Sequence, residues 1–276
     1  DAAVLLEAVR KELENDIYKF YVGTSYRHLT IWDKGEVVDL TPPHDVLGQK
    51  IGQYLPKDDK LREMMKKSYD ILSNHPINVE RMKRGLNPAN SLWFWGAGTR
   101  PMLTSFEEKT GHKGAMISAV DLLKGIAVGA GMKVIEVEGA NGGLDTNYEG
   151  KADAAVDVLL NGGCDFAYIH LEAPDEMGHQ GSYERKVKAI ENLDKRIIKR
   201  VVEKMEAAGE DFRMLVLPDH PTPVAIRTHV SDPVPYMLYD STDKKNNTWS
   251  YNEKDGEASG NYIAEGHTII NRLFEK

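Results

Sequence analysis

The sequence predicts an α/β protein in which helices cover both faces of a mostly parallel sheet, together with a smaller α+β unit. In the second part of the chain, short apolar runs alternate with amphipathic segments of helix length, as they do in repeated β–α units. In the first part, strand-like runs separated by turn residues lie between two helical segments. The 276 residues are enough for one large domain or two smaller ones. We therefore expect an α+β domain over residues 1–91 and an α/β domain over residues 92–276.

The first domain is expected to begin with an amphipathic helix over residues 2–14. Its apolar residues recur every three or four positions, which places Val4, Leu5, Val9 and Leu13 on one face. The segments expected to follow are strands over 16–24 and 26–32, a hairpin-type turn at 33–35 that leads into 36–40, a rigid Pro-Pro loop over 41–45, a helix over 57–73 and a loop-rich stretch over 74–90. Short strands combined with helices in this way indicate an α+β unit.

The second domain is expected to alternate strands with helices. Strands are expected at residues 92–95, 115–117, 133–137, 165–171, 213–217 and 234–239, and helices at 120–130, 152–160, 182–208 and 264–274. In the longest helix, Ser182 would be the N-cap and Gly209 would lie just past the end. The polar stretch 240–260 is expected to be a surface loop. This alternation indicates a mostly parallel sheet that is covered on both faces.

The composition argues against several classes of protein. The net charge of −8 argues against a general nucleic-acid-binding surface, and no apolar run reaches the roughly 18 residues of a membrane helix. Cys164 is the only cysteine, so no internal disulfide can form, and we expect it to be a buried residue in a reducing compartment. We therefore expect a cytoplasmic protein with a small-molecule substrate and without nucleic-acid or membrane partners. Whether it forms a homo-oligomer stays open.

Five residues of the second domain form a candidate set of metal ligands, namely Asp175, His179, Asp219, His220 and His229. The first two follow one predicted strand and the next two follow another, so both pairs would lie at the carboxyl ends of strands, where open α/β sheets bind ligands. Asp175 and His179 are four residues apart and would point the same way from one helical turn. Asp219 and His220 are neighbours and would point to opposite sides of an extended chain, which suits two ions. Three imidazoles and two carboxylates suit a divalent ion such as Mn²⁺ or Zn²⁺.

Two segments of the second domain carry recognisable motifs, residues 165–182 (DFAYIHLEAPDEMGHQGS) and 217–236 (LPDHPTPVAIRTHVSDPVPY). Shorter motifs occur in the expected order at residues 25–28, 41–45, 75–78 with Arg81, 93–96 and 142–148. Together these motifs resemble the cofactor-independent phosphoglycerate mutases of the archaeal type, which belong to the alkaline phosphatase superfamily. The resemblance covers nearly the whole chain. It implies an alkaline phosphatase-like core, with the first domain as an inserted substrate or phosphotransferase domain.

The resemblance implies a site with two metal ions. Asp175, His179 and His229 would hold one ion. Asp219 and His220 would hold the other, together with an aspartate and a nucleophilic serine that the family carries on an N-terminal segment preceding the region matched here. We therefore expect a truncated chain with an incomplete second site and no catalytic serine; the serines that do not match the family's nucleophile context are Ser25, Ser68, Ser91, Ser105, Ser118 and Ser182. Mn²⁺ is the preferred ion, with Zn²⁺, Co²⁺ or Mg²⁺ as alternatives.

The reaction implied by the resemblance is the interconversion of 3-phosphoglycerate and 2-phosphoglycerate through a phosphoserine intermediate. This step of glycolysis and gluconeogenesis would need no 2,3-bisphosphoglycerate. Divalent ions would lower the pKa of the serine hydroxyl and neutralise charge on the phosphoryl oxygens. We expect the complete enzyme to be a mutase, an isomerase that transfers a phosphoryl group within one molecule, and we expect this chain alone to be inactive.

Substrate binding is assigned to six residues, namely Arg27, His44, Asp45, Arg81, Arg84 and Lys124. Guanidinium groups bind phosphate and carboxylate through paired hydrogen bonds, and Arg27 and Arg81 match family positions. Arg84 would share a helical face with Arg81, and for each arginine a solvated surface charge is the alternative. The histidine and aspartate on the Pro-Pro loop would orient hydroxyls or transfer protons. For Lys124, an exposed helical lysine without a ligand is the favoured interpretation.

Two other functions stay open. A homoserine kinase-like phosphotransferase would use the same metal ligands but would need an aromatic or apolar pocket for a nucleotide base, whereas phosphoglycerate needs at least two cations besides the metal ions. A non-catalytic metal-binding fragment would keep one metal site and bind phosphorylated ligands weakly. The glycine-rich residues 139–143 (GANGG) do not follow a P-loop pattern, so no nucleotide is assigned to them.

Overall fold

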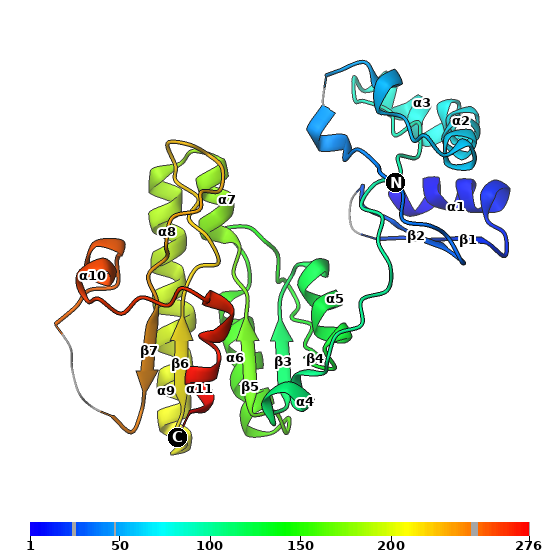
Figure 1. Cartoon of the computed structure of the whole chain (residues 1–276). Helices are drawn as coiled ribbons and strands as arrows, with labels where there is room; N and C mark the ends of the chain where they lie inside the picture. Colours follow the sequence, from blue (N-terminus) through cyan, green and yellow to red (C-terminus); the bar gives the residue numbers. More distant parts are fainter. Residues whose placement is uncertain (24–25, 47, 244–247, 276) are drawn as a thin grey trace. The chain divides into compact units, whose positions relative to one another are not determined.

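A computed structural model describes residues 1–23, 26–46, 48–243 and 248–275 of the chain (Figure 1). The chain divides into two compact units, Asp1–Pro101 and Met102–Lys276, whereas the sequence placed the boundary after residue 91. The strand predicted at residues 92–95 is wrong, because this segment is irregular. Leu92 and Phe94 instead pack against the core of the first unit.

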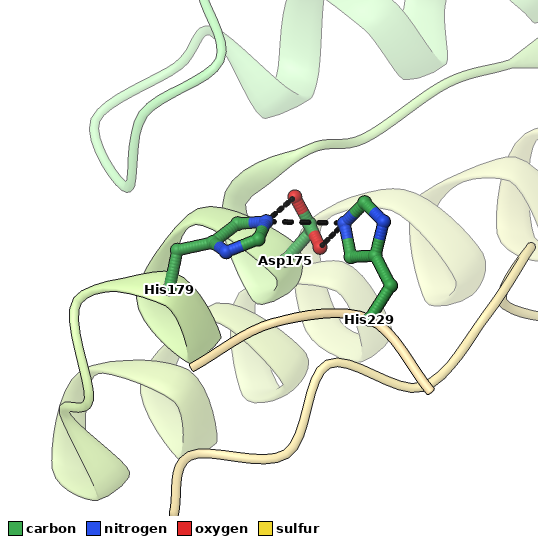
Figure 2. A group of neighbouring side chains, drawn as sticks. All are labelled: Asp175, His179 and His229. Carbon is green, nitrogen blue, oxygen red and sulfur yellow. Dashed lines mark hydrogen bonds and ion pairs between the residues drawn. The ribbon is translucent and has the colours of Figure 1, made fainter. Parts of the chain in front are cut away.

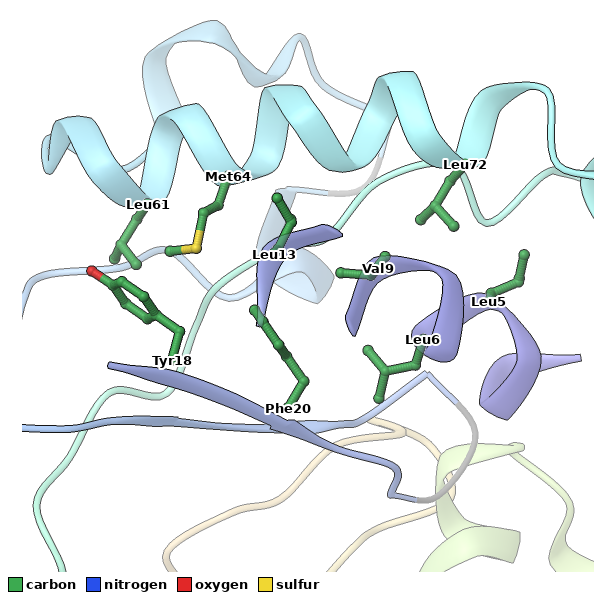
Figure 3. Packing of buried hydrophobic residues seen from close by; sticks show 9 residues of the cluster. All are labelled: Leu5, Leu6, Val9, Leu13, Tyr18, Phe20, Leu61, Met64 and Leu72. Carbon is green, nitrogen blue, oxygen red and sulfur yellow. The ribbon is translucent and has the colours of Figure 1, made fainter. Parts of the chain in front are cut away.

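The first unit packs helices against a β-hairpin. Its elements are α1 (Ala2–Leu13), β1 (Tyr18–Tyr21), β2 (Leu29–Trp32), the 3₁₀ helices η1 (Pro43–Val46) and η2 (Ile51–Tyr54), α2 (Asp59–Ser73) and α3 (Pro76–Lys83). The two strands are antiparallel, with Tyr18 opposite Trp32. Figure 3 shows the apolar face of α1, including Val9, gathered with Phe20 of the hairpin and Leu61 of α2 into one buried cluster. Burial of these side chains stabilises the unit through the hydrophobic effect.

Three segments of the first unit differ from the sequence-based expectation. Residues 36–40 are not a strand, and in the described part of the chain the hairpin consists of β1 and β2. The Pro-Pro loop becomes a 3₁₀ helix from Pro43, because the fixed φ of proline also suits the first turn of a helix. The loop-rich stretch contains α3. Pro76 occupies its first turn, where a missing N–H costs nothing, and the Nδ1 atom of His75 accepts a hydrogen bond from the N–H of Ile77 at 3.3 Å.

The second unit contains a parallel sheet and a separate antiparallel pair of strands. The sheet has the order β4–β3–β5, formed by β3 (Gly114–Ile117), β4 (Lys133–Val134) and β5 (Phe166–Ile169), and the pair consists of β6 (Arg213–Val216) and β7 (Met237–Asp240). The α-helices are α4 (Phe106–Thr110), α5 (Asp121–Gly129), α6 (Tyr148–Leu160), α7 (Ala173–His179), α8 (Tyr183–Leu193), α9 (Lys199–Ala208), α10 (Glu253–Ala258) and α11 (Asn271–Phe274). The α/β class predicted from the sequence is confirmed.

Helix α6 is central to the packing of the second unit, where it contacts β3, β5 and α9. The buried cluster between α6 and the segment formed by residues 194–208, which includes α9, consists of Tyr148, Ala152, Val156, Ile197, Val201 and Met205. At the rim of this interface, the guanidinium group of Arg200 donates to both carboxylate oxygens of Asp153, at 2.7 and 2.8 Å. Cys164 is buried, as predicted.

Parts of the second unit also differ from expectation. The helix predicted over 182–208 contains a π-helical segment, Asp194–Ile198, between α8 and α9, and it ends at Gly209 with a φ of +72°, as predicted. The closing helix predicted over 264–274 is wrong, because only a 3₁₀ turn (η4, Gly266–Thr268) and the short α11 form there. The polar loop over 240–260 contains α10. None of the helices in the described part of the chain is long and apolar enough to cross a membrane.

Candidate metal centre

Helix α7 brings the first two candidate ligands together. Three residues separate the end of β5 from the start of this helix, which has Pro174 in its first turn. Asp175 and His179 lie one turn apart on it, and His179 Nε2 is 3.3 Å from Asp175 Oδ2 (Figure 2). The spacing of these two residues therefore produces the common direction that the sequence predicted.

The loop between β6 and β7 supplies a third donor to the same point. His229 Nε2 lies 3.3 Å from Asp175 Oδ1 and 3.1 Å from His179 Nε2. Figure 2 shows the two imidazole rings on opposite sides of the Asp175 carboxylate. One ligand atom from each of the three residues lies within 4.8 Å of the others. Residues 50 positions apart in the sequence thus form one cluster, which we call the donor triad.

The donor triad fits a divalent metal ion. Donor atoms that bind one ion at about 2.0–2.2 Å in tetrahedral or octahedral geometry lie roughly 3–3.5 Å from one another. The two imidazole Nε2 atoms are 3.1 Å apart, and each lies 3.3 Å from a different oxygen of the Asp175 carboxylate, so these separations fall in that range. One carboxylate and two imidazoles are also a donor set that Zn²⁺ and Mn²⁺ accept. Both the spacing and the chemistry therefore suit a metal site.

A buried hydroxyl links the triad to His220. Thr222 is 3% exposed, and its hydroxyl donates a hydrogen bond to Asp175 Oδ1. The hydroxyl oxygen of Thr222 also lies 3.3 Å from Nδ1 of His220. Because the hydroxyl proton is used in the bond to Asp175, Nδ1 of His220 must be the donor in this second hydrogen bond. Lys186 of α8 donates to the Thr222 carbonyl at 2.7 Å. Thr222 and Lys186 were not predicted from the sequence, because their role depends on contacts with residues 36 to 47 positions away.

Asp219 and His220 are arranged differently from the prediction. Their side chains do not point to opposite sides, since Asp219 Oδ2 lies 3.3 Å from His220 Nε2. The backbone bends at these two residues instead of remaining extended, and the N–H of His220 donates to Asp219 Oδ1 at 3.1 Å. The ring centroids of His220 and His229 are 3.6 Å apart, so His220 borders the donor triad. A second ion at Asp219 and His220 stays a prediction.

A buried polar cluster next to the start of α7 was also not predicted from the sequence. Lys151 of α6 is fully buried, and its Nζ donates to the carbonyl of His170 at 3.0 Å. Glu172 precedes α7; its Oε1 is buried and has no hydrogen-bond partner among the residues that the structure describes, and its Oε2 would lie 2.6 Å from a Cβ added at Gly142. The sequence did contain a signal that Lys151 is buried, because its spacing places it on the same helical face as Tyr148 and Ala155.

The buried cluster shifts the pKa values of its members. Burial lowers the pKa of Lys151, and the charge of Glu172 opposes this shift. Burial raises the pKa of Glu172. The charge of Lys151 opposes this rise, and the charges of Glu176 and Asp175 reinforce it. Burial, reinforced by Lys151, lowers the pKa of His170. The charge at the start of α7 is therefore held in a poorly solvated environment next to the donor triad.

The predicted substrate-binding residues are distributed over both units. Arg27, Asp45, Arg81 and Arg84 belong to the first unit and Lys124 to the second, and the side chain of His44 lies outside the described part of the chain. Arg27 is exposed, with its guanidinium 5.1 Å from the centre of the Tyr26 ring. Arg81 donates to the Asn87 carbonyl at 2.9 Å. Lys124 forms an ion pair with Glu136 at 2.7 Å and its side chain is only 21% exposed, so it is not the freely exposed lysine of the favoured interpretation. The substrate roles stay predictions.

Comparisons with known proteins identify relatives of the whole chain. The model of the metalloenzyme superfamily matches residues 24–267. A 2,3-bisphosphoglycerate-independent phosphoglycerate mutase of Methanosarcina barkeri is 51% identical over 249 residues, which are 88% of this chain and 62% of that protein. A probable enzyme of the same name from Geobacter sulfurreducens is 43% identical over 277 residues, which cover 99% of this chain and 69% of that protein.

The fold also matches a solved structure. The PH0037 protein of Pyrococcus horikoshii is 26% identical, with a TM-score of 0.77, and the match covers 98% of this chain and 67% of that structure. The chain thus spans about three fifths of the length of the Methanosarcina relative and about two thirds of the Pyrococcus structure. These matches agree with an alkaline phosphatase-like core and with the resemblance seen in the motifs.

Proposed function

Because this chain belongs to the metalloenzyme superfamily and to its family of 2,3-bisphosphoglycerate-independent phosphoglycerate mutases, we propose that the protein containing it interconverts 3-phosphoglycerate and 2-phosphoglycerate. The observation that carries the proposal is the donor triad, in which Asp175, His179 and His229 meet at separations of 3.1 to 3.3 Å. The resemblance assigned the same three residues to one metal ion. The proposed reaction is a cytoplasmic step of glycolysis and gluconeogenesis.

The residues of the second unit have separate tasks in this proposal. The donor triad would hold one divalent ion, for which Mn²⁺ is our choice, while Asp219 and His220 would contribute to a second. Bound divalent ions supply charge neutralisation on phosphoryl oxygens and lower the pKa of a coordinated hydroxyl. Thr222 orients the Asp175 carboxylate through its hydroxyl, and Lys186 fixes the Thr222 backbone. Such supporting contacts restrict the ligands to one geometry.

The first unit would contribute the groups that recognise the substrate. A phosphoglycerate carries a phosphate and a carboxylate, which suit the guanidinium groups of Arg27 and Arg81, with Arg84 as a weaker choice. His44 and Asp45 would orient the hydroxyl groups. We propose the mutase and not a homoserine kinase-like enzyme, because the named curated relatives are mutases.

The test is an enolase-coupled assay with Mn²⁺ and without bisphosphoglycerate. The enzyme is a chimaera in which this chain replaces the matching region of the Methanosarcina barkeri protein, so the result does not depend on where this chain begins or ends. We expect turnover by the chimaera and a loss of about 100-fold or more in Asp175→Asn, because a metal ligand is removed. The matched control is Asp211→Asn, an exposed carboxylate of the same unit. A folded, Mn²⁺-loaded chimaera without turnover would contradict the mutase assignment.

A further inference from the structure

Arg227 has an unusual backbone conformation for its residue type. Its φ is +61°, and among the non-glycine residues described by the structure it shares a positive φ with Lys34 alone. A side chain with a Cβ is disfavoured in this left-handed region, so the surrounding structure must enforce the conformation. Arg227 precedes the triad residue His229 by two positions. A strained residue at this place calls for an explanation in terms of the site.

The loop around Arg227 contains the contacts that enforce its conformation. The Pro223 carbonyl accepts hydrogen bonds from the N–H groups of Ile226 and Arg227, at 3.1 and 2.8 Å. The N–H of Val230 donates to the Pro221 carbonyl at 3.2 Å and closes the loop. The Arg227 guanidinium occupies the space that a Cβ at Gly181 would need. The loop is therefore fixed both by its own backbone and by the turn after α7.

The result of this conformation is a contact with the donor triad. The carbonyl oxygen of Arg227 lies 3.0 Å from Nδ1 of His179. A carbonyl can only accept a hydrogen bond, so Nδ1 of His179 carries the proton. In a neutral imidazole, Nε2 then holds the lone pair, and Nε2 is the atom that faces Asp175 and His229. A metal-binding histidine needs this tautomer and ring orientation.

We propose that Arg227 is a positioning residue, whose left-handed backbone aims its carbonyl at His179 and fixes Nε2 as the metal-binding atom. The inference rests on the donor triad being the metal site of the proposed function. It assigns the effect to the backbone of Arg227 and not to its charge. Residues that tolerate a positive φ should therefore preserve metal binding at this position, whereas β-branched residues should weaken it.

The experiment compares Arg227→Gly with Arg227→Val in this chain, with Mn²⁺ affinity measured by electron paramagnetic resonance of the free ion. Both variants lose the guanidinium, but only glycine accepts a positive φ without strain. We expect Arg227→Gly to bind Mn²⁺ within about threefold of the unchanged chain, and Arg227→Val to bind it about 10-fold or more weakly, as is typical when the partner of a metal-binding histidine is disturbed. The matched control is Lys34→Val, which strains the other described non-glycine residue with a positive φ, in the first unit, and should leave Mn²⁺ affinity unchanged.

A second measurement reports on the tautomer itself. In nitrogen-15 spectra of the metal-free chain, His179 should show a protonated Nδ1 in the unchanged protein and in Arg227→Gly, and a mixture of tautomers in Arg227→Val. Equal Mn²⁺ affinity and the same tautomer in both variants would overturn the inference. Asp175→Asn separates this outcome from a failure of the metal site: if it leaves Mn²⁺ affinity unchanged, the donor triad is not the site, whatever the Arg227 variants do.

Discussion

The core of the first unit and the donor triad of the second unit are held together in different ways. Around α1, buried apolar side chains such as Leu6 and Phe20, which are 3% and 2% exposed, pack from helices and a hairpin into one cluster. At the triad, the side chains of Asp175 and His229 remain 32% and 50% exposed, and hydrogen bonds from neighbouring loops orient the site. Non-directional burial can fix a fold, whereas directional contacts are needed to fix a ligand geometry.

The comparison predicts that core truncation affects stability and leaves metal binding intact. Phe20→Ala should lower the free energy of unfolding by about 3–5 kcal/mol, because it removes a buried aromatic ring and leaves a cavity. Ile31→Ala on the exposed edge of the same hairpin should cost far less, within about 0.5 kcal/mol. Urea unfolding measures both, and Mn²⁺ affinity of the folded variants should be unchanged. A large loss of Mn²⁺ affinity in Phe20→Ala would break the separation between the two regions.

Substitution of Lys151 tests whether a buried polar group contributes to stability, as the core does, or to metal binding, as the donor triad does. Lys151→Met should cost about 1–3 kcal/mol, because it leaves the His170 carbonyl without its hydrogen bond and Glu172 without a nearby cation. It should also weaken Mn²⁺ binding, since the affected turn leads into α7. Adding Glu172→Gln to Lys151→Met should recover part of the stability, which a double-mutant cycle of unfolding free energies would detect. Strict additivity of the two changes would argue against a coupled pair.

The smallest effect is expected from the Asp153 ion pair at the rim of the second unit. Hydrogen bonds from Arg200, aided by Lys204 and opposed by partial burial, lower the pKa of Asp153 from 3.8 to about 2. Because the folded-state pKa is lowered, this stabilisation is present above about pH 4 and is lost as the pH falls towards 2. The effect should be small, since both side chains are more than a third exposed and solvent screens the charges.

This pH dependence is measured by urea unfolding of the unchanged chain and of Asp153→Asn between pH 6 and pH 2. The stability difference between the two proteins should shrink as the pH falls through the range in which Asp153 becomes protonated. A difference that stays constant over this range would show that the ion pair does not contribute as the geometry suggests.

The sequence allowed prediction of those features that depend on local periodicity. The apolar spacing of Val9 and its neighbours located α1, and the four-residue spacing of Asp175 and His179 gave their common direction. The loop-rich stretch predicted over residues 74–90 contains α3, because Pro76 occupies the first turn of a helix, a position that tolerates proline. Local rules therefore located α1 and the common direction of Asp175 and His179.

Features that depend on single backbone bends could not be predicted in this way. Asp219 and His220 were expected on opposite sides of an extended chain, but a bend brings their side chains to 3.3 Å. The contacts of Thr222 with Asp175 and of Arg227 with His179 join residues 47 and 48 positions apart, and no periodic pattern indicates them. The five candidate ligands could thus be named from the sequence, while the groups that orient them required the structure.

The most direct test of the donor triad is a crystal structure of this chain soaked with Mn²⁺, with the ion located by its anomalous scattering. The account predicts an anomalous peak about 2.0–2.3 Å from one oxygen of Asp175 and from the Nε2 atoms of His179 and His229. The Nδ1 atom of His179 should still face the Arg227 carbonyl. Mn²⁺ bound elsewhere, with the triad free of metal at saturating concentration, would contradict the assignment of these three residues as the metal centre.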